Sequence, residues 1–180
     1  MLIGNGHDVD TICNDSEETA LFGACQQGVV ETAKLLLECG ADVHKRNADG
    51  YTVLHKAAAA PTQDVRLLEL LLKAGLDASS GAEISGLPVN HAETGRTPWL
   101  SAILCGRAIT LRHLKSVASF PSESGRIIWN DDDVEAALKL CETNQLDCVR
   151  QLCEWGLDCN AQSSTSKDTL VLAAARGSAQ

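Results

Sequence analysis

The chain has 180 residues, of which 44% are hydrophobic, 22% charged and 3% aromatic, and its net charge is −9. This composition can bury a core, which excludes intrinsic disorder, and the scarcity of aromatic residues favours closely packed helices over a β sandwich. An acidic surface repels phosphate backbones, so we expect no nucleic-acid partner. The sequence has no polybasic run and no apolar run of about 20 residues, so we expect no membrane partner.

The N-terminus, MLIGNGHDVD, lacks the basic start and the apolar stretch of a secretory signal peptide. We therefore expect an intracellular protein, cytoplasmic or nuclear, that is monomeric or part of a larger chain. The eight cysteines are accordingly not expected to form the disulfide framework of a secreted domain.

Apolar periodicity and helix-capping residues predict four pairs of helices along the chain. The predicted pairs span residues 20–27 with 30–38, 53–60 with 64–73, 98–105 with 108–119, and 134–142 with 145–154. The second helix of a pair carries apolar residues on one face, as Val65, Leu68, Leu71 and Leu72 do. The predicted fold class is therefore all-α.

Two sequence patterns recur along the chain in step with these helices. Glycine followed by aspartate two residues later begins at Gly6, Gly40, Gly75 and Gly156, and the first two copies lie 34 residues apart. A threonine that opens an apolar helical segment occurs at Thr19, Thr52, Thr97 and Thr169. Because both patterns repeat together, each copy is interpreted as one structural unit.

These residues resemble the ankyrin repeat, a unit of about 33 residues with a turn and two antiparallel helices, marked by T-P-L-H-x-A. The resemblance covers nearly the whole chain and implies an ankyrin-repeat solenoid of stacked helix-turn-helix units with turn or hairpin loops. Only the unit that begins at Thr52 keeps the threonine and the histidine together, because Phe22, Leu100 and Leu172 stand in place of His55 elsewhere. For His55 the resemblance implies a structural hydrogen bond near the Thr52 hydroxyl or the loop backbone.

The repeat register predicts one array over residues 1–180. It has partial units at 1–15 and 166–180, and full units at about 16–48, 49–93, 94–131 and 132–165. Insertions are expected at about 79–88 and 121–133, and the three aspartates that end the second insertion are expected to cap the following helix. Because the array opens and closes on incomplete units, we expect a piece of a longer array or a piece flanked by other domains.

We expect no metal site and no cofactor. The last four cysteines are Cys141, Cys148, Cys153 and Cys159, spaced by 7, 5 and 6 residues without the close pairs usual in zinc sites. In the repeat register Cys153 takes the place of Leu37 and Cys159 that of Val43, so we expect these cysteines to pack as small buried hydrophobes. A cysteine-based metal or redox site in the last full unit is the alternative. The sequence contains no nucleophile elbow, P-loop or metalloprotease motif, so we expect a protein that is not an enzyme.

The resemblance implies that a partner protein, unidentified by the sequence, is bound by the loop tips and the exposed side of the first helices. We transfer these partner-binding positions to this sequence and add Trp129 from the second insertion. The candidates are Asp15, Glu18, Gln26, Gln27, Asp49, Tyr51, Glu93, Arg96, Leu104 and Trp129. Tyr51 has the alternative of packing on a neighbouring loop, and Trp129 that of covering the edge of the array. The predicted function is a non-catalytic protein-protein interaction module. The alternative is the targeting or regulatory arm of a larger enzyme, such as a ubiquitin ligase, a kinase or a signalling NTPase.

Overall fold

The computed structural model of the chain describes residues 8–78, 98–117, 122–123, 126–127, 129, 131–162 and 169. These residues belong to two units, Met1–Pro98 and Trp99–Gln180, which are described separately below.

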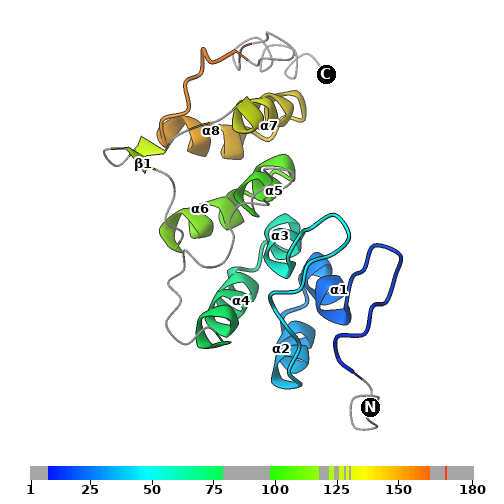
Figure 1. Ribbon diagram of the computed structural model, residues 1–180. Coiled ribbons are helices and arrows are strands. Elements are labelled where there is room, and N and C mark those ends of the chain that lie inside the picture. The colour runs from blue at the N-terminus through cyan, green and yellow to red at the C-terminus, as the bar shows by residue number, and fades with distance from the viewer. Residues whose placement is uncertain are drawn as a thin grey trace. The chain divides into compact units, whose positions relative to one another are not determined.

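Two antiparallel helix pairs form the first unit (Figure 1). They are α1 (Ala20–Gln27) with α2 (Val30–Glu38), and α3 (Val53–Ala59) with α4 (Val65–Ala78). The first helices α1 and α3 lie side by side, and so do the second helices α2 and α4, so the unit has two helical layers. The loops at residues 8–19 and 41–52 project beyond α1 and α3.

The core of this unit lies between the two helical layers. It is built from Leu21 and Phe22 of α1, Leu36 of α2, and Leu67 and Leu68 of α4, all of which are buried. The apolar face predicted for the second helix is confirmed at Leu68 and Leu71, which are also buried. Val65 and Leu72 are only half-buried, whereas Leu67, which was not part of the predicted face, is buried.

Two helices end with the glycine that the repeat pattern marks. Gly40 has φ 88°, and the N–H groups of Gly40 and Ala41 donate to the carbonyl oxygens of Leu37 (2.9 Å) and Leu36 (3.0 Å). Gly156 has φ 97° and follows α8 in the same way, since its N–H donates to the Cys153 carbonyl oxygen over 3.0 Å. These are left-handed helix caps, for which glycine carries no steric penalty from a side chain.

The second unit contains most of α5 (Pro98–Leu104), α6 (Ala108–Val117), α7 (Asp131–Glu142) and α8 (Leu146–Glu154). Between α6 and α7 lies a small antiparallel hairpin, β1 (Ser122–Glu123) with β2 (Arg126–Ile127), in which Ser122 pairs with Ile127. Helix α7 begins at Asp131, three residues before the predicted start. The three aspartates thus form its first turn, where negative charge is stabilised by the helix dipole.

The predicted all-α fold is confirmed, and all eight predicted helices are present within a few residues of their expected bounds. The insertion expected at 79–88 lies outside the described residues, and the repeat-unit boundaries and the single array over 1–180 stay predictions. Within the part of the chain that the structure describes, no helix is both long enough and apolar enough to span a membrane.

Candidate partner-binding surface

Asn47 holds the loop at residues 46–52 in a tight turn. The Asn47 N–H donates to the Tyr51 carbonyl oxygen over 3.0 Å, and the Gly50 N–H donates to the Asn47 carbonyl oxygen over 2.8 Å. The Tyr51 N–H donates to Oδ1 of Asn47 over 2.8 Å. Asn47 is buried, whereas Ala48 and Asp49 at the tip are exposed, so the turn is fixed from its inner side.

Glu18 joins this loop to the preceding one. Lys56 Nζ lies 2.7 Å from Glu18 Oε1, and Asn47 Nδ2 donates to the same oxygen over 3.1 Å. The backbone adds a direct link, because the Ala48 N–H donates to the Ser16 carbonyl oxygen over 2.9 Å. The two side chains of the ion pair are only 12% (Glu18) and 23% (Lys56) exposed, so water screens their attraction less than it screens a surface pair. We call the surface formed by residues 13–18 and 46–51 the loop ledge.

The Glu18 carboxyl group is held in its charged form. Burial alone would raise its pKa, but hydrogen bonds from Lys56, Asn14 and Asn47, together with the positive charge of Lys56, outweigh burial and lower the pKa below its ordinary value of 4.5. Asn14 Nδ2 donates to Glu18 Oε2 over 3.2 Å, and the Glu18 N–H donates to Asn14 Oδ1 over 3.0 Å. Glu18 is therefore a structural anion that organises the ledge.

A second link joins the same two loops beside the ledge. The Asp42 N–H donates to the Asp10 carboxylate, 3.2 Å from each oxygen. Lys45 Nζ donates to the Asp10 carbonyl oxygen over 3.1 Å. The segments 8–11 and 42–45 are thus held together in addition to the contacts around Glu18.

Thr52 and His55 form a capping box at the start of α3. The Thr52 N–H donates to His55 Nδ1 over 3.2 Å, and Thr52 Oγ1 lies 2.9 Å from the same nitrogen. Both residues are buried, and the Tyr51 ring meets the His55 ring edge-on at a centroid distance of 5.4 Å. The structural role that the resemblance implies for His55 is confirmed.

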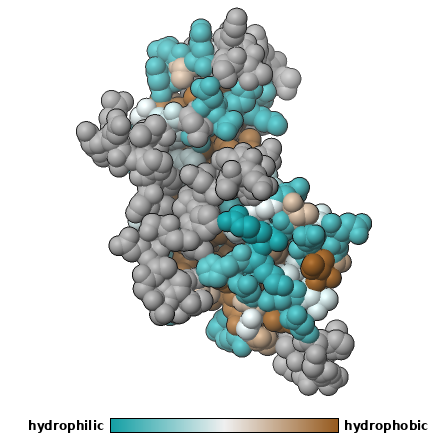
Figure 2. Space-filling model, viewed as in Figure 1, coloured by the Kyte–Doolittle hydropathy of each residue, from teal (hydrophilic) through white to brown (hydrophobic). Residues whose placement is uncertain are grey.

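The outer side of the loop ledge is acidic. Asp15, Glu17 and Asp49 are exposed on it, while the exposed cation on the same loops is Arg46. Figure 2 shows that much of the visible described surface in the first unit is hydrophilic. The ledge therefore has solvent-exposed carboxylates on loops that are held in position by part-buried hydrogen bonds.

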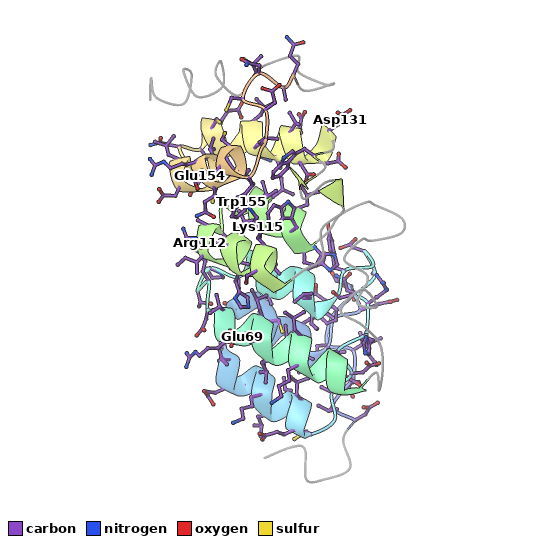
Figure 3. All side chains as sticks on the ribbon, turned by 90° about the vertical axis from the view of Figure 1, so that its left-hand side faces the viewer. Glu69, Arg112, Lys115, Asp131, Glu154 and Trp155 are labelled. Carbon is purple, nitrogen blue, oxygen red and sulfur yellow. The ribbon has the colours of Figure 1, made fainter. Side chains whose placement is uncertain are left out.

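In the second unit, Trp99 contacts two other tryptophans. The Trp99 ring lies 5.4 Å from that of Trp155 and 6.1 Å from that of Trp129, between ring centroids. Lys115 Nζ lies 4.4 Å from the centre of the Trp155 ring, within the range of a cation–π contact (Figure 3). Trp129 Nε1 is buried without a hydrogen-bond partner among the described residues.

The cysteines divide into buried and accessible thiols. Cys141 and Cys148 are buried, as expected, and Cys25 is buried as well. Burial raises the pKa of Cys25 to about 12 and that of Cys148 to about 11. The expectation of burial is wrong for Cys159, which is exposed, and Cys153 is only partly buried. In the same turn Leu157 is buried. The described residues contain no group of three or more His, Cys, Asp or Glu side chains arranged to hold a metal ion.

Comparison with known proteins agrees with this repeat geometry. Residues 1–82 match the family model of ankyrin repeats in three copies. Residues 1–82 belong to the ankyrin repeat family. Its structure resembles that of the human ASB11 ankyrin repeat domain, with a TM-score of 0.67 and 24% identity, over 97% of this chain and 70% of that one.

Two curated relatives show how far the ankyrin similarity extends. The Notch-regulated ankyrin repeat-containing protein of Xenopus tropicalis is 41% identical over 63 residues, which are 35% of this chain and 54% of the relative. The protein fem-1 homolog A-like of Mus musculus is 32% identical over 144 residues, 79% of this chain and 20% of the relative. The chain thus spans about half of the first relative's length and a fifth of the second. Ankyrin repeats generally mediate protein-protein interactions through their extended surfaces.

The residues predicted to bind a partner do not all lie on one surface. Asp15, Glu18, Asp49 and Tyr51 lie together on the loop ledge, but Glu18 is engaged inside the chain. Gln26 and Gln27 are exposed at the far end of α1, about 10 Å along the helix axis from the residues that enter it.

The other predicted residues belong elsewhere. Leu104 is exposed at the end of α5, and Trp129 is half-buried against Trp99, both in the second unit. Glu93 and Arg96 lie outside the described residues. Binding by any of the ten residues stays a prediction.

Sequence reasoning missed the residues that build the ledge from within, Asn14, Asn47 and Lys56. Asn47 carried a usable signal, because asparagine three residues before a glycine is typical of a turn whose side chain bonds to its own backbone. Lys56 carried none, since nothing in a single sequence pairs it with Glu18, 38 positions earlier.

Proposed function

We propose that the chain is a non-catalytic protein-interaction module that binds its partner on the loop ledge and the adjoining exposed side of α1. The observation that supports this most strongly is the tie between the two loops through Glu18, Asn47 and Lys56. A surface that is already ordered before binding loses less conformational entropy on association, so more of the contact energy is available as affinity.

The exposed side of α1 adjoins the ledge and is nearly free of bulky side chains. Ala20 and Gly23 are exposed at a spacing of three residues, and Gln27 follows four residues later on the same face. A partner segment can therefore approach the backbone of α1 closely near the ledge. Gln26 and Gln27 offer amide donors and acceptors at the far end of the helix.

The charge of the ledge favours a partner with a basic surface. Asp15 and Asp49 are exposed at the tips and make no hydrogen bond or ion pair with another described residue. Solvated charges of this kind accelerate encounter with an oppositely charged partner and give an association rate that falls as salt is added. A partner segment rich in lysine and arginine would fit this surface.

Affinity purification from native cells tests the proposal with two charge-matched variants. Asp15→Lys/Asp49→Lys reverses the charge of the ledge, and Glu31→Lys/Glu38→Lys makes the same change on exposed positions of α2. Circular dichroism and thermal melts confirm that both variants are folded. Proteins that are lost only with the ledge variant support the proposal. Proteins that are retained by the ledge variant, or lost equally with both, refute it.

The targeting or regulatory arm of a larger enzyme stays the alternative hypothesis. It draws support from the fem-1 relative, in which the matched region is 20% of the whole. An antibody raised against this chain would then detect a native protein much larger than 19.1 kDa. A native species of 19.1 kDa would exclude the alternative.

A further inference from the structure

Two accessible thiols lie side by side in the second unit. Cys153 Sγ is 3.1 Å from Cys159 Sγ, at the end of α8 and in the turn that follows it. A covalent disulfide has an S–S distance of about 2.0 Å, so the two sulfurs need to approach by roughly 1 Å to form one. Cys159 is exposed and Cys153 is partly exposed, so a soluble oxidant can reach the pair.

The backbone of the turn accounts for this placement. Beyond α8 the chain reverses at Gly156, and the Leu157 N–H donates to the Leu152 carbonyl oxygen over 3.0 Å. The Asn160 N–H donates to Asp158 Oδ1 over 2.8 Å, which fixes the next turn around Cys159. The same glycine reversal follows α2, where the corresponding residues are Leu37 and Val43. Two replacements by cysteine on a shared backbone path thus create a thiol pair that the first unit lacks.

We propose that Cys153 and Cys159 form a redox-sensitive site that closes into an intramolecular disulfide when it meets a hydroperoxide. The Cys159 sulfur attacks one peroxide oxygen, the O–O bond breaks, water leaves, and Cys159 becomes a sulfenic acid. The Cys153 sulfur then attacks the sulfenic sulfur, its proton leaves with the hydroxyl group as a second water, and the S–S bond forms. The two thiols lose two electrons in total, and these reduce one hydrogen peroxide to two waters.

The assignment of roles follows from the surroundings of each sulfur. Burial, followed by the hydrogen bond and the interaction with Cys159, raises the pKa of Cys153 to about 12. Cys153 is therefore a protonated thiol that can donate toward Cys159, and the exposed Cys159 is the sulfur that an oxidant meets first. Cys141 interacts electrostatically with both but is buried, which makes it the competing partner to test.

The disulfide would close a short loop around Trp155. Because the Trp155 ring stacks on Trp99 beneath Lys115, a disulfide two residues away constrains the turn that presents this ring. The site lies in Trp99–Gln180, whereas the loop ledge lies in Met1–Pro98, so this inference is independent of the proposed function.

Peptide mapping of the full-length chain after treatment with hydrogen peroxide tests the proposal directly. Trypsin cleaves after Lys139, Arg150 and Lys167, so Cys153 and Cys159 fall in one peptide, 151–167, and Cys141 and Cys148 in another, 140–150. We expect peptide 151–167 to lose about 2 Da, to resist alkylation at both cysteines, and to recover on treatment with dithiothreitol.

Variants separate the two roles. In Cys153→Ser we expect a sulfenic acid at Cys159 that dimedone labels, and in Cys159→Ser no labelling at Cys153, whereas Cys141→Ser behaves as the wild type. A disulfide that links peptide 140–150 to peptide 151–167 would overturn the proposal. So would a wild-type chain whose peptide 151–167 remains fully alkylated after peroxide, or stoichiometric zinc that protects both thiols.

Discussion

Thr19 and Thr52 precede α1 and α3 in the same way, but the structure gives only Thr52 a partner for its hydroxyl. Thr52 Oγ1 lies 2.9 Å from His55 Nδ1, three residues into the helix, where α1 has Phe22 instead. Thr19 Oγ1 is buried and has no hydrogen-bond partner among the described residues. Replacement of each threonine by valine, which keeps the shape and removes the hydroxyl, should therefore affect stability differently.

The expected magnitudes follow from these surroundings. Thr52→Val removes the buried hydroxyl that contacts His55 Nδ1 and accepts the His55 N–H in the capping box, while the Thr52 N–H still donates to His55 Nδ1. We therefore expect a loss of about 1 kcal/mol and at most about 2 kcal/mol. Thr19→Val removes a buried hydroxyl that already lacks a partner, so we expect no loss and up to about 1 kcal/mol of gain. For a chain of 180 residues, each kcal/mol corresponds to roughly 2–4 °C in Tm.

Urea denaturation of both variants beside the wild type, followed by far-ultraviolet circular dichroism, measures the difference. His55→Phe recreates the α1 arrangement in α3, and the double variant Thr52→Val/His55→Phe completes a double-mutant cycle. We expect the double variant to be more stable than the sum of the single losses, by about 1 kcal/mol, because both remove the same contact. Equal destabilisation by Thr52→Val and Thr19→Val, or strictly additive losses in the cycle, would show that the capping box does not stabilise α3.

Three further predictions concern the first unit. Because the folded-state pKa of Glu18 is lowered, the ionised Glu18 carboxylate stabilises the folded chain. This contribution to the unfolding free energy is fully present above pH 4.5 and is lost as the pH falls through the folded-state pKa. Glu18→Gln should thus lower the unfolding free energy by about 1–2 kcal/mol at pH 7, and urea titrations from pH 7 to pH 3 should show the gap to wild type closing. Gly28→Ala should lower Tm more than Gly40→Ala does. Both glycines have positive φ, but only at Gly28 would a Cβ clash with Thr62, so Gly28→Ala/Thr62→Ala should recover the difference in Tm. Gly23→Ala should stabilise by about 0.5–1 kcal/mol, because Gly23 is an exposed helical position with open space for a Cβ; unchanged or lower stability in melts would contradict this.

The sequence predicted the backbone better than the contacts between side chains. Helix positions and the reversals at Gly40 and Gly156 depend on local patterns, which a single sequence carries in full. The contact between Thr52 and His55 was also accessible, because both residues lie within one helical turn. The early start of α7 at Asp131 shows the usual difficulty with boundaries, since aspartates suit both a cap and a first helical turn.

The interior of the loop ledge could not be predicted in this way. Glu18 meets Asn47 and Lys56 from 29 and 38 positions away, and one sequence holds no record of which distant residues pair. The pairing of Cys153 with Cys159 was missed for a different reason. The repeat register assigned each cysteine separately to an apolar buried position, and it holds no information on whether two such side chains meet in the turn.

In the proposed function, neighbouring residues of the two loops have different roles, because some stabilise the ledge and others meet the partner. Glu18 has its carboxylate satisfied by Lys56 and Asn47, so a partner could use it only by breaking contacts that hold the surface together. Asp15 and Asp49 are hydrated and exposed, so a basic partner can pair with them without disturbing the fold. The shielded ion pair thus links the two loops, and in the proposed function the solvated carboxylates at the tips are the groups that meet the partner. Changes at Asp15 or Asp49 remove no described contact within the chain, so we expect these two positions to tolerate substitution without loss of the fold.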